Sequence, residues 1–196
     1  MHHVYFKKRL LNSDLDILLE RCRKMDQQSQ ADLYRLCYPA MINTCYRYAP
    51  DADGAGTIFN NAMLRVFSNL GNYSDEGKFM AWVRSIVINC CIDFCKKRNL
   101  FRQSVPHFDE EQTTIDPHVF ERVSAKEIQL MLKRLPASTA TVFNMYVYEG
   151  FTHKQVATAL EISEGTSKWH LSEAKKLLKA HLQHLLNSEL RQNAAG

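Results

Sequence analysis

The segment EISEGTSKWHLSEAKKLLK, residues 161–179, places several lysines and one tryptophan on a helical pattern. At about 100° per residue, small and apolar side chains share one side of this helix, namely Ser167, Leu171, Ala174 and Leu178. The remaining side suits nucleic acid, because lysines bind phosphates or guanine edges, serine bonds a base or phosphate, and tryptophan packs on thymine methyls or sugars. The candidate DNA-binding residues are Gly165, Thr166, Lys168, Trp169, Ser172, Lys175 and Lys176. The alternative is a solvated helix whose tryptophan covers its neighbour.

A second candidate site follows the loop GNYSDEG. Its helix carries an apolar stripe that includes Trp82, with Asn89 and Asp93 beside the stripe and one turn apart. Polar groups next to a partly buried aromatic suit the capture of a base flipped out of its stack, and Tyr73 adds a stacking face. The candidate residues for single-stranded DNA are Tyr73, Trp82, Asn89, Asp93, Lys96, Lys97 and Arg98. Alternatively, Trp82 only packs, Asn89 and Asp93 bond each other, and the basic residues form a solvated helix end.

Helices must position both sites, because the chain shows helical periodicity and no convincing β alternation. We predict helices over residues 14–25, 29–48, 57–70, 78–98, 123–134, 136–148 and 152–160, followed by the lysine-rich helix. Pro39 should bend or break the second of these. Thr152 and Gln155 form a capping-box pattern, and Ser163 is an N-cap. Two short helices joined by a three-residue turn are typical of a helix-turn-helix, whose second helix enters the major groove.

A domain boundary is predicted at NLFRQSVPHFDEEQTTIDPH, which is polar, acidic and interrupted by two prolines. The predicted fold class is therefore all-α, with two small helical domains joined by a flexible acidic linker. The limits that we expect are residues 1–100, 101–122 and 123–196.

Composition, the opening residues and the lengths of the apolar runs together indicate the cellular compartment in which we expect the protein. The 196 residues are 45% hydrophobic and 23% charged, with a formal net charge of +4, which identifies no partner by itself. The opening MHHVYFKKRLL lacks the apolar region of a secretory signal, and no run approaches the roughly 18 apolar residues of a membrane helix. We expect a reduced, cytoplasmic protein without membrane insertion, whose cysteines serve mostly as small core hydrophobes.

Metal-dependent catalysis has little support in the sequence. His181 with His184, or Cys91 with Cys95, fall at spacings that could share a metal ion. No third ligand or general base accompanies either pair. We predict no catalytic residue, no metal and no cofactor.

The stretch from Leu135, LPASTATVFNMYVYEGFTHKQVATALEISEGTSKWHLSEAKKLL, closely resembles region 4 of bacterial RNA polymerase sigma factors of the extracytoplasmic-function (ECF) branch. LP at 135–136, EG at 149–150 and EGTSK at 164–168 stand where that family has its own versions. The segments DLYRLCYPAMINTCYRYAPDADGA and FMAWVRSIVINCCIDFCKKR are similar to region 2. The family pattern of the promoter-melting helix is filled by Phe79, Trp82, Asn89 and Asp93.

This resemblance implies a protein that binds core RNA polymerase and directs promoter-specific initiation. By resemblance, the C-terminal domain reads the −35 duplex, the N-terminal domain opens the −10 element as single strands, and the linker threads the polymerase channel. It also implies an anti-sigma factor as a partner. A helix-turn-helix repressor is the main alternative, and it would leave the N-terminal half without a role.

Two departures from the family pattern affect these expectations. The polymerase-binding helix usually starts with an acidic pair and then glutamine, where this chain has Gly56, Thr57 and Asn60. A basic residue common in the recognition helix is replaced by Glu173. We therefore expect polymerase docking through Asn60 and Asn61, held by amide hydrogen bonds and apolar contact rather than by charge.

Overall fold

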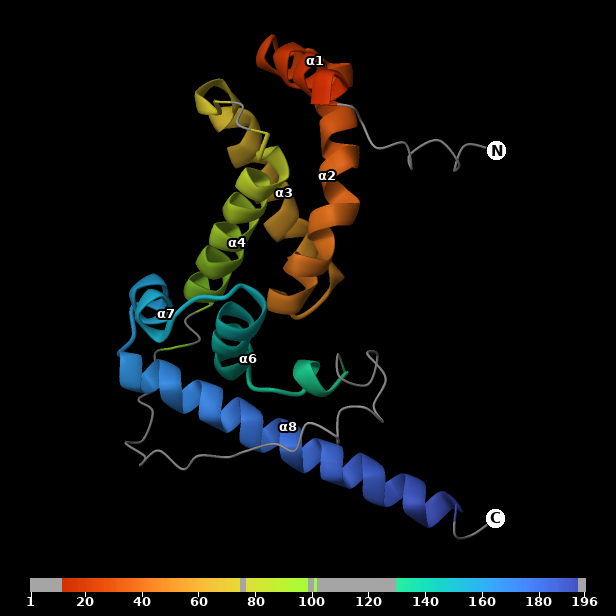
Figure 1. Cartoon of the computed structure of the whole chain (residues 1–196), viewed down its shortest axis with the longest axis vertical. Helices are drawn as coiled ribbons and strands as arrows, with labels where there is room; N and C mark the ends of the chain where they lie inside the picture. The colour runs from red at the N-terminus through yellow and green to blue at the C-terminus, as the bar shows by residue number, and fades with distance from the viewer. Residues whose placement is uncertain (1–11, 75–76, 99–100, 102–129, 194–196) are drawn as a thin grey trace. The chain divides into compact units, whose positions relative to one another are not determined.

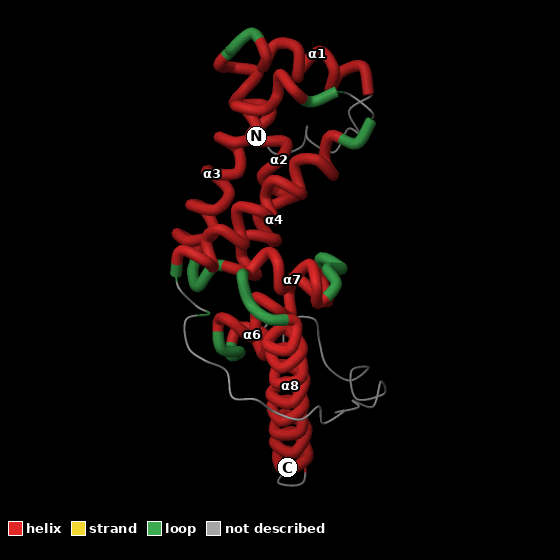
Figure 2. Tube along the Cα trace, turned by 90° about the vertical axis from the view of Figure 1, so that its left-hand side faces the viewer, coloured by secondary structure: helices red, strands yellow, loops and turns green. Residues whose placement is uncertain are grey.

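All elements in the described part of the chain are helical, which confirms the all-α fold class. The computed structural model describes residues 12–74, 77–98, 101 and 130–193. Figures 1 and 2 show the helices, which are α1 (Asn12–Arg23), α2 (Gln27–Tyr48), α3 (Ala52–Asn69), the 3-10 turn η1 (Leu70–Asn72), α4 (Phe79–Lys97), α6 (Ala137–Phe143), the π-helix η3 (Asn144–Tyr148), α7 (His153–Leu160) and α8 (Glu164–Asn193). None of these helices has the length and apolar character needed to cross a bilayer.

The chain divides into two compact units, Met1–Cys91 and Ile92–Gly196, so the division falls within α4. The predicted domain limits stay a prediction. The acidic linker and most of the predicted helix 123–134 lie outside the described residues.

The core of the first unit forms where α2 and α3 pack along each other. Phe59 is fully buried at its centre, and Ile58 and Val66 extend the apolar side of α3. Phe79 and Val83 supply the buried side of α4. These residues recur at helical spacing, so their burial follows from the amphipathic pattern.

The start of α3 differs from our prediction. We expected a loop up to Gly56, but the helix begins at Ala52. The Asp51 side chain caps it by accepting the Gly54 N–H at 2.7 Å, and Ala55 is already buried. A Cβ at Gly54 would lie 3.2 Å from the Asp51 Oδ1, which is closer than an ordinary van der Waals contact, so a larger residue would have to displace the capping side chain slightly. Burial and capping outweigh the roughly 1 kcal/mol that a glycine costs inside a helix.

The predicted break at Pro39 does not occur, since α2 continues from Gln27 to Tyr48. Pro39 lies on the exposed side of the helix. Water can bond the Arg35 carbonyl that the proline leaves without a helical donor, while buried Cys37 and Met41 hold the flanking turns in the core.

The cysteines are confirmed as small core groups, because all six are buried and none forms a disulfide. Burial raises the pKa of the Cys22 thiol to about 11 and that of Cys37 to about 12. Both thiols are therefore protonated, unreactive groups at neutral pH.

The core of the second unit lies between α6, the turn before it and the middle of α8. Its buried residues are Met131, Leu135, Ala174, Leu178 and Leu182. Between α6 and α7 the chain makes a π-helical turn, in which the Glu149 N–H bonds the Asn144 carbonyl at 3.1 Å. Tyr146, Val147 and Tyr148 are exposed on this turn.

Candidate nucleic-acid interfaces

Residues 152–179 form the predicted helix-turn-helix. Thr152 and Gln155 make the predicted capping box at the start of α7. Glu161 ends α7 in the left-handed region with φ 58°, and Ser163 caps α8 by accepting the Thr166 N–H at 2.9 Å. These local groups fix the angle at which α8 leaves the turn.

Two polar contacts hold α8 in place, and sequence analysis missed both. The His153 Nδ1 lies 2.9 Å from the Oγ of buried Ser167, and Tyr146 stacks on the His153 ring. Further along, the Nδ1 of His170 lies 3.1 Å from the Thr139 Oγ1. The contacts join residues 14 and 31 positions apart, so no local pattern could reveal them.

His170 carries no charge at neutral pH. Its ring is buried behind the outer side of α8, and burial lowers its pKa to about 4. The positive charge of this helix therefore comes from its lysines.

The helical-wheel prediction for α8 is confirmed on its inner side, where Ser167, Leu171, Ala174 and Leu178 are all buried. On the outer side, the candidate residues Gly165, Lys168, Lys175 and Lys176 are exposed, and Thr166, Trp169 and Ser172 are half-buried. The three lysines form a basic surface of the kind that binds DNA phosphates.

Two of these candidates have further contacts within the fold, and a third is a glycine. Trp169 is not fully outward, because its ring packs edge-on against His170 with centroids 4.9 Å apart. The Thr166 hydroxyl lies 2.9 Å from the Ser163 Oγ and so belongs to the helix cap. A Cβ at Gly165 would make only an ordinary contact of 3.6 Å with Ser163, so the fold itself does not require glycine there.

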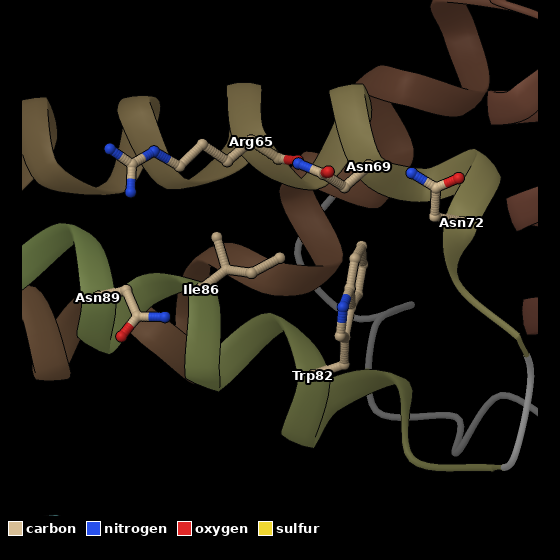
Figure 3. A pocket seen from close by; sticks show the side chains of 6 residues that line it. All are labelled: Arg65, Asn69, Asn72, Trp82, Ile86 and Asn89. Carbon is tan, nitrogen blue, oxygen red and sulfur yellow. The ribbon is translucent and has the colours of Figure 1, made fainter.

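The first unit contains a cavity of ≈ 240 Å³ between α3 and α4 (Figure 3). Its lining residues are Arg65, Asn69, Asn72, Trp82, Ile86 and Asn89. Figure 3 shows the Trp82 ring standing from α4 toward Asn69 and Asn72 at the end of α3. The structure thus brings together the predicted Trp82 and Asn89 and adds four residues that the sequence did not identify. In the sequence, Asn69 could have been identified only by its position just before the GNYSDEG loop, and Asn72 by its position within it.

Tyr73 does not offer the open stacking face that we expected. It is only 9% exposed, and its ring lies against Trp82 with centroids 4.8 Å apart and edge-on to Phe79 at 5.4 Å. The short loop turns this side chain inward to extend the core. Tyr73 therefore supports Trp82 from behind, and Trp82 both packs and lines the cavity.

The other candidates of α4 lie outside the cavity lining. Asp93 is half-buried, one turn beyond Asn89. Lys96 pairs with the Glu161 carboxylate, Lys97 is exposed, and the Arg98 guanidinium lies 5.8 Å from the centre of the Phe94 ring. Exposed ion pairs contribute at most about 1 kcal/mol, so Lys96 can exchange its partner for a phosphate.

The predicted polymerase-binding residues share one surface of α3. Asn60 and Asn61 are exposed, and the Asn60 Oδ1 accepts a hydrogen bond of 2.8 Å from the Tyr34 hydroxyl. Leu64, one turn further, is 64% exposed. Ile58 and Ala62 are buried and belong to the opposite side. The exposed surface therefore combines amides with one apolar side chain.

Across the described residues, no group of three or more His, Cys, Asp or Glu side chains is arranged to hold a metal ion.

Comparison with known families gives two matches in chain order. "Sigma-70 region 2" matches residues 33–101, and "Sigma-70, region 4" matches residues 125–178. The first match contains the cavity, and the second contains the helix-turn-helix up to Leu178.

Similar proteins include the RNA polymerase sigma-H factor of Pseudomonas aeruginosa, which is 22% identical over 182 residues, covering 86% of this chain and 94% of that protein. The ECF RNA polymerase sigma factor SigL of Mycobacterium tuberculosis is 27% identical over 166 residues, covering 80% of this chain and 93% of the relative. Among solved structures, the sigma factor RpoE from Bartonella quintana, in complex with the anti-sigma factor NepR, has a TM-score of 0.47 at 18% identity, covering 78% of this chain and 96% of that one.

Proposed function

Because the chain belongs to the ECF sigma factors, which direct RNA polymerase to specific promoters, we propose that its two DNA-binding surfaces are the outer side of α8 and the cavity beside Trp82. The observation that carries this proposal is the cavity itself, which combines an aromatic ring with amide side chains. Core polymerase performs the chemistry, so the chain itself needs no catalytic residue or cofactor. The protein works where polymerase and promoter DNA meet, in the cytoplasm.

The −35 duplex is read by the first turns of α8. Lys168, Lys175 and Lys176 are exposed and bind phosphates or guanine edges, while half-buried Ser172 offers a hydroxyl to the same groove. Trp169 contributes the part of its ring that His170 leaves uncovered. Gly165 lets the DNA backbone approach the start of the helix closely.

The −10 element is held at the cavity after its strands separate. A flipped base stacks on Trp82, which Tyr73 supports from behind. Asn72 and Asn89 can each donate and accept hydrogen bonds, as base edges require, and the side-chain oxygen of Asn69 accepts while its amide nitrogen bonds the Arg65 carbonyl. Asp93, Lys96, Lys97 and Arg98, which follow Asn89 along α4, are the other residues that we propose to contact this strand.

Binding to core polymerase should distinguish this protein from a repressor. With purified core polymerase, we expect promoter DNA to be protected from nuclease and transcribed from one start site. Without core polymerase, neither should occur at the same concentration. Protection of the same DNA by the chain alone would indicate a conventional helix-turn-helix repressor. Promoters mapped after induced expression supply the DNA for this experiment.

The chain docks on core polymerase through the exposed side of α3 that carries Asn60, Asn61 and Leu64. We expect the double variant Asn60→Ala/Asn61→Ala to bind core polymerase roughly five- to tenfold more weakly, since each lost hydrogen bond contributes about 0.5–1.5 kcal/mol. Wild-type binding should depend only weakly on salt, because Thr57 and the asparagines carry no charge. A titration at low and high salt measures both, with Gln28→Ala as the control for loss of an exposed amide. A steep salt dependence, or full affinity in the double variant, would show that core polymerase binds a different surface of the chain.

An anti-sigma partner is implied by the family alone and stays a prediction. We expect the chain, when isolated from its native cells without an inducing signal, to form a stoichiometric complex with this partner. In the reconstituted transcription assay, the complex should be inactive.

A further inference from the structure

Helix α1 precedes the residues that match Sigma-70 region 2, and its last residue, Arg23, contacts the turn beside the cavity. The family match starts at residue 33, and Arg23 ends α1. The Arg23 Nε donates to the Leu70 carbonyl at 3.2 Å, and its Nη2 donates to the Tyr73 carbonyl at 3.0 Å. One guanidinium therefore holds both ends of the 3-10 turn η1.

The backbone around Arg23 is well placed for this contact. Leu19 and Cys22 are buried, so α1 is fixed against the first unit. The Glu20 carboxylate lies 3.6 Å from the Arg23 Nη1 and steadies the side chain, which is 30% exposed. A cation at the carboxyl end of α3 is also favoured by the helix dipole.

The η1 turn, which Arg23 holds at both ends, leads directly to the cavity. Asn72, the last residue of the turn, lines the cavity, and the Tyr73 ring supports Trp82 with centroids 4.8 Å apart. We infer that Arg23 is a positioning residue for the −10 site, which fixes the η1 turn and through Tyr73 sets the orientation of Trp82. This inference rests on the proposed binding of a flipped base at Trp82. Lysine cannot reproduce the contact, because its single ammonium lacks the planar fork that bonds two carbonyls.

The test uses the full chain with Trp169→Phe, which leaves Trp82 as the only tryptophan of the two in the sequence. In this background we expect Arg23→Ala to make Trp82 fluorescence more accessible to acrylamide quenching. In the holoenzyme, we expect binding of a single-stranded −10 oligonucleotide from a mapped promoter to weaken about five- to tenfold, and Arg23→Lys to show most of this loss. Arg21→Ala, an exposed arginine in the same turn, is the matched control and should behave like the parent.

A double-mutant cycle separates this inference from the proposed function. If Trp82→Ala leaves oligonucleotide binding unchanged, the proposed site itself is wrong. If Trp82→Ala weakens binding, Arg23→Ala should add almost nothing to it. Full additivity of the two changes, parent-like binding by Arg23→Ala, or parent-like binding by Arg23→Lys would each overturn the positioning role.

Discussion

Replacing Trp82 by alanine is expected to reduce promoter opening by roughly ten- to a hundredfold, because base–aromatic stacking contributes about 1–3 kcal/mol per base. Trp82 is half-buried and presents its ring to the cavity, so the substitution removes the face on which a flipped base would stack. Permanganate reactivity of thymines around the start site, measured with holoenzyme, reports the opening.

Controls must separate stacking from packing, since the Trp82 ring also contacts Tyr73 and Phe79. Trp82→Phe keeps an aromatic face and should retain most of the activity. Tyr46→Ala removes an exposed aromatic of α2 outside the cavity lining and should have no effect. Equal thymine reactivity in wild type and Trp82→Ala, at equal polymerase binding, would contradict a base site at this cavity.

Replacing Lys168 by alanine is expected to lower transcription from −35-dependent promoters about tenfold, since a good base contact contributes about 1–3 kcal/mol. Lys168 is exposed and lies on the outer side of α8, so its removal should leave the fold intact. Run-off transcription from promoters with varied −35 sequences provides the measurement. A base contact changes the preference among these sequences, whereas a phosphate contact weakens all of them equally and lowers the salt dependence.

Trp169→Ala is a less selective experiment. Because its ring packs against buried His170, this change should lower both promoter activity and the melting temperature of the second unit. Lys133→Ala, an exposed lysine outside α8, controls for loss of charge alone. If Lys168→Ala and Trp169→Ala both transcribe at wild-type levels across all −35 sequences, α8 does not read DNA as proposed.

The elements that the sequence predicted well are those fixed by neighbouring residues. The capping box at Thr152 and the cap at Ser163 depend on groups three residues apart, so their pattern is visible in the chain. The buried side of α8 follows equally from helical spacing. The start of α3 was missed because aspartates and glycines favour turns, while burial of Ala55 decides the helix.

The cavity could be predicted only in part, because it depends on how distant helices meet. Trp82 and Asn89 lie on one helix, and their spacing marked them as a pair. Asn69 and Asn72 face them only because the end of α3 packs beside α4, which no local pattern encodes. The buried position of Tyr73 depends in the same way on its contact with Phe79.

The direction in which α8 leaves the second unit's core depends on how many residues form the π-helical turn from Asn144 to Tyr148. Its closing hydrogen bond spans five residues, one more than an α-helical turn. Deleting a single residue here would restore an ordinary α-turn and rotate everything that follows by about 100° around the helix axis. Val142 would keep its place in the core, while α7 and α8 would point in a new direction. Because α8 also packs against Met131 and Leu135, and its His170 contacts Thr139, three partners that all precede the turn, such a deletion would separate these contacts. The length of the π-helical turn is therefore matched to the core that holds α8.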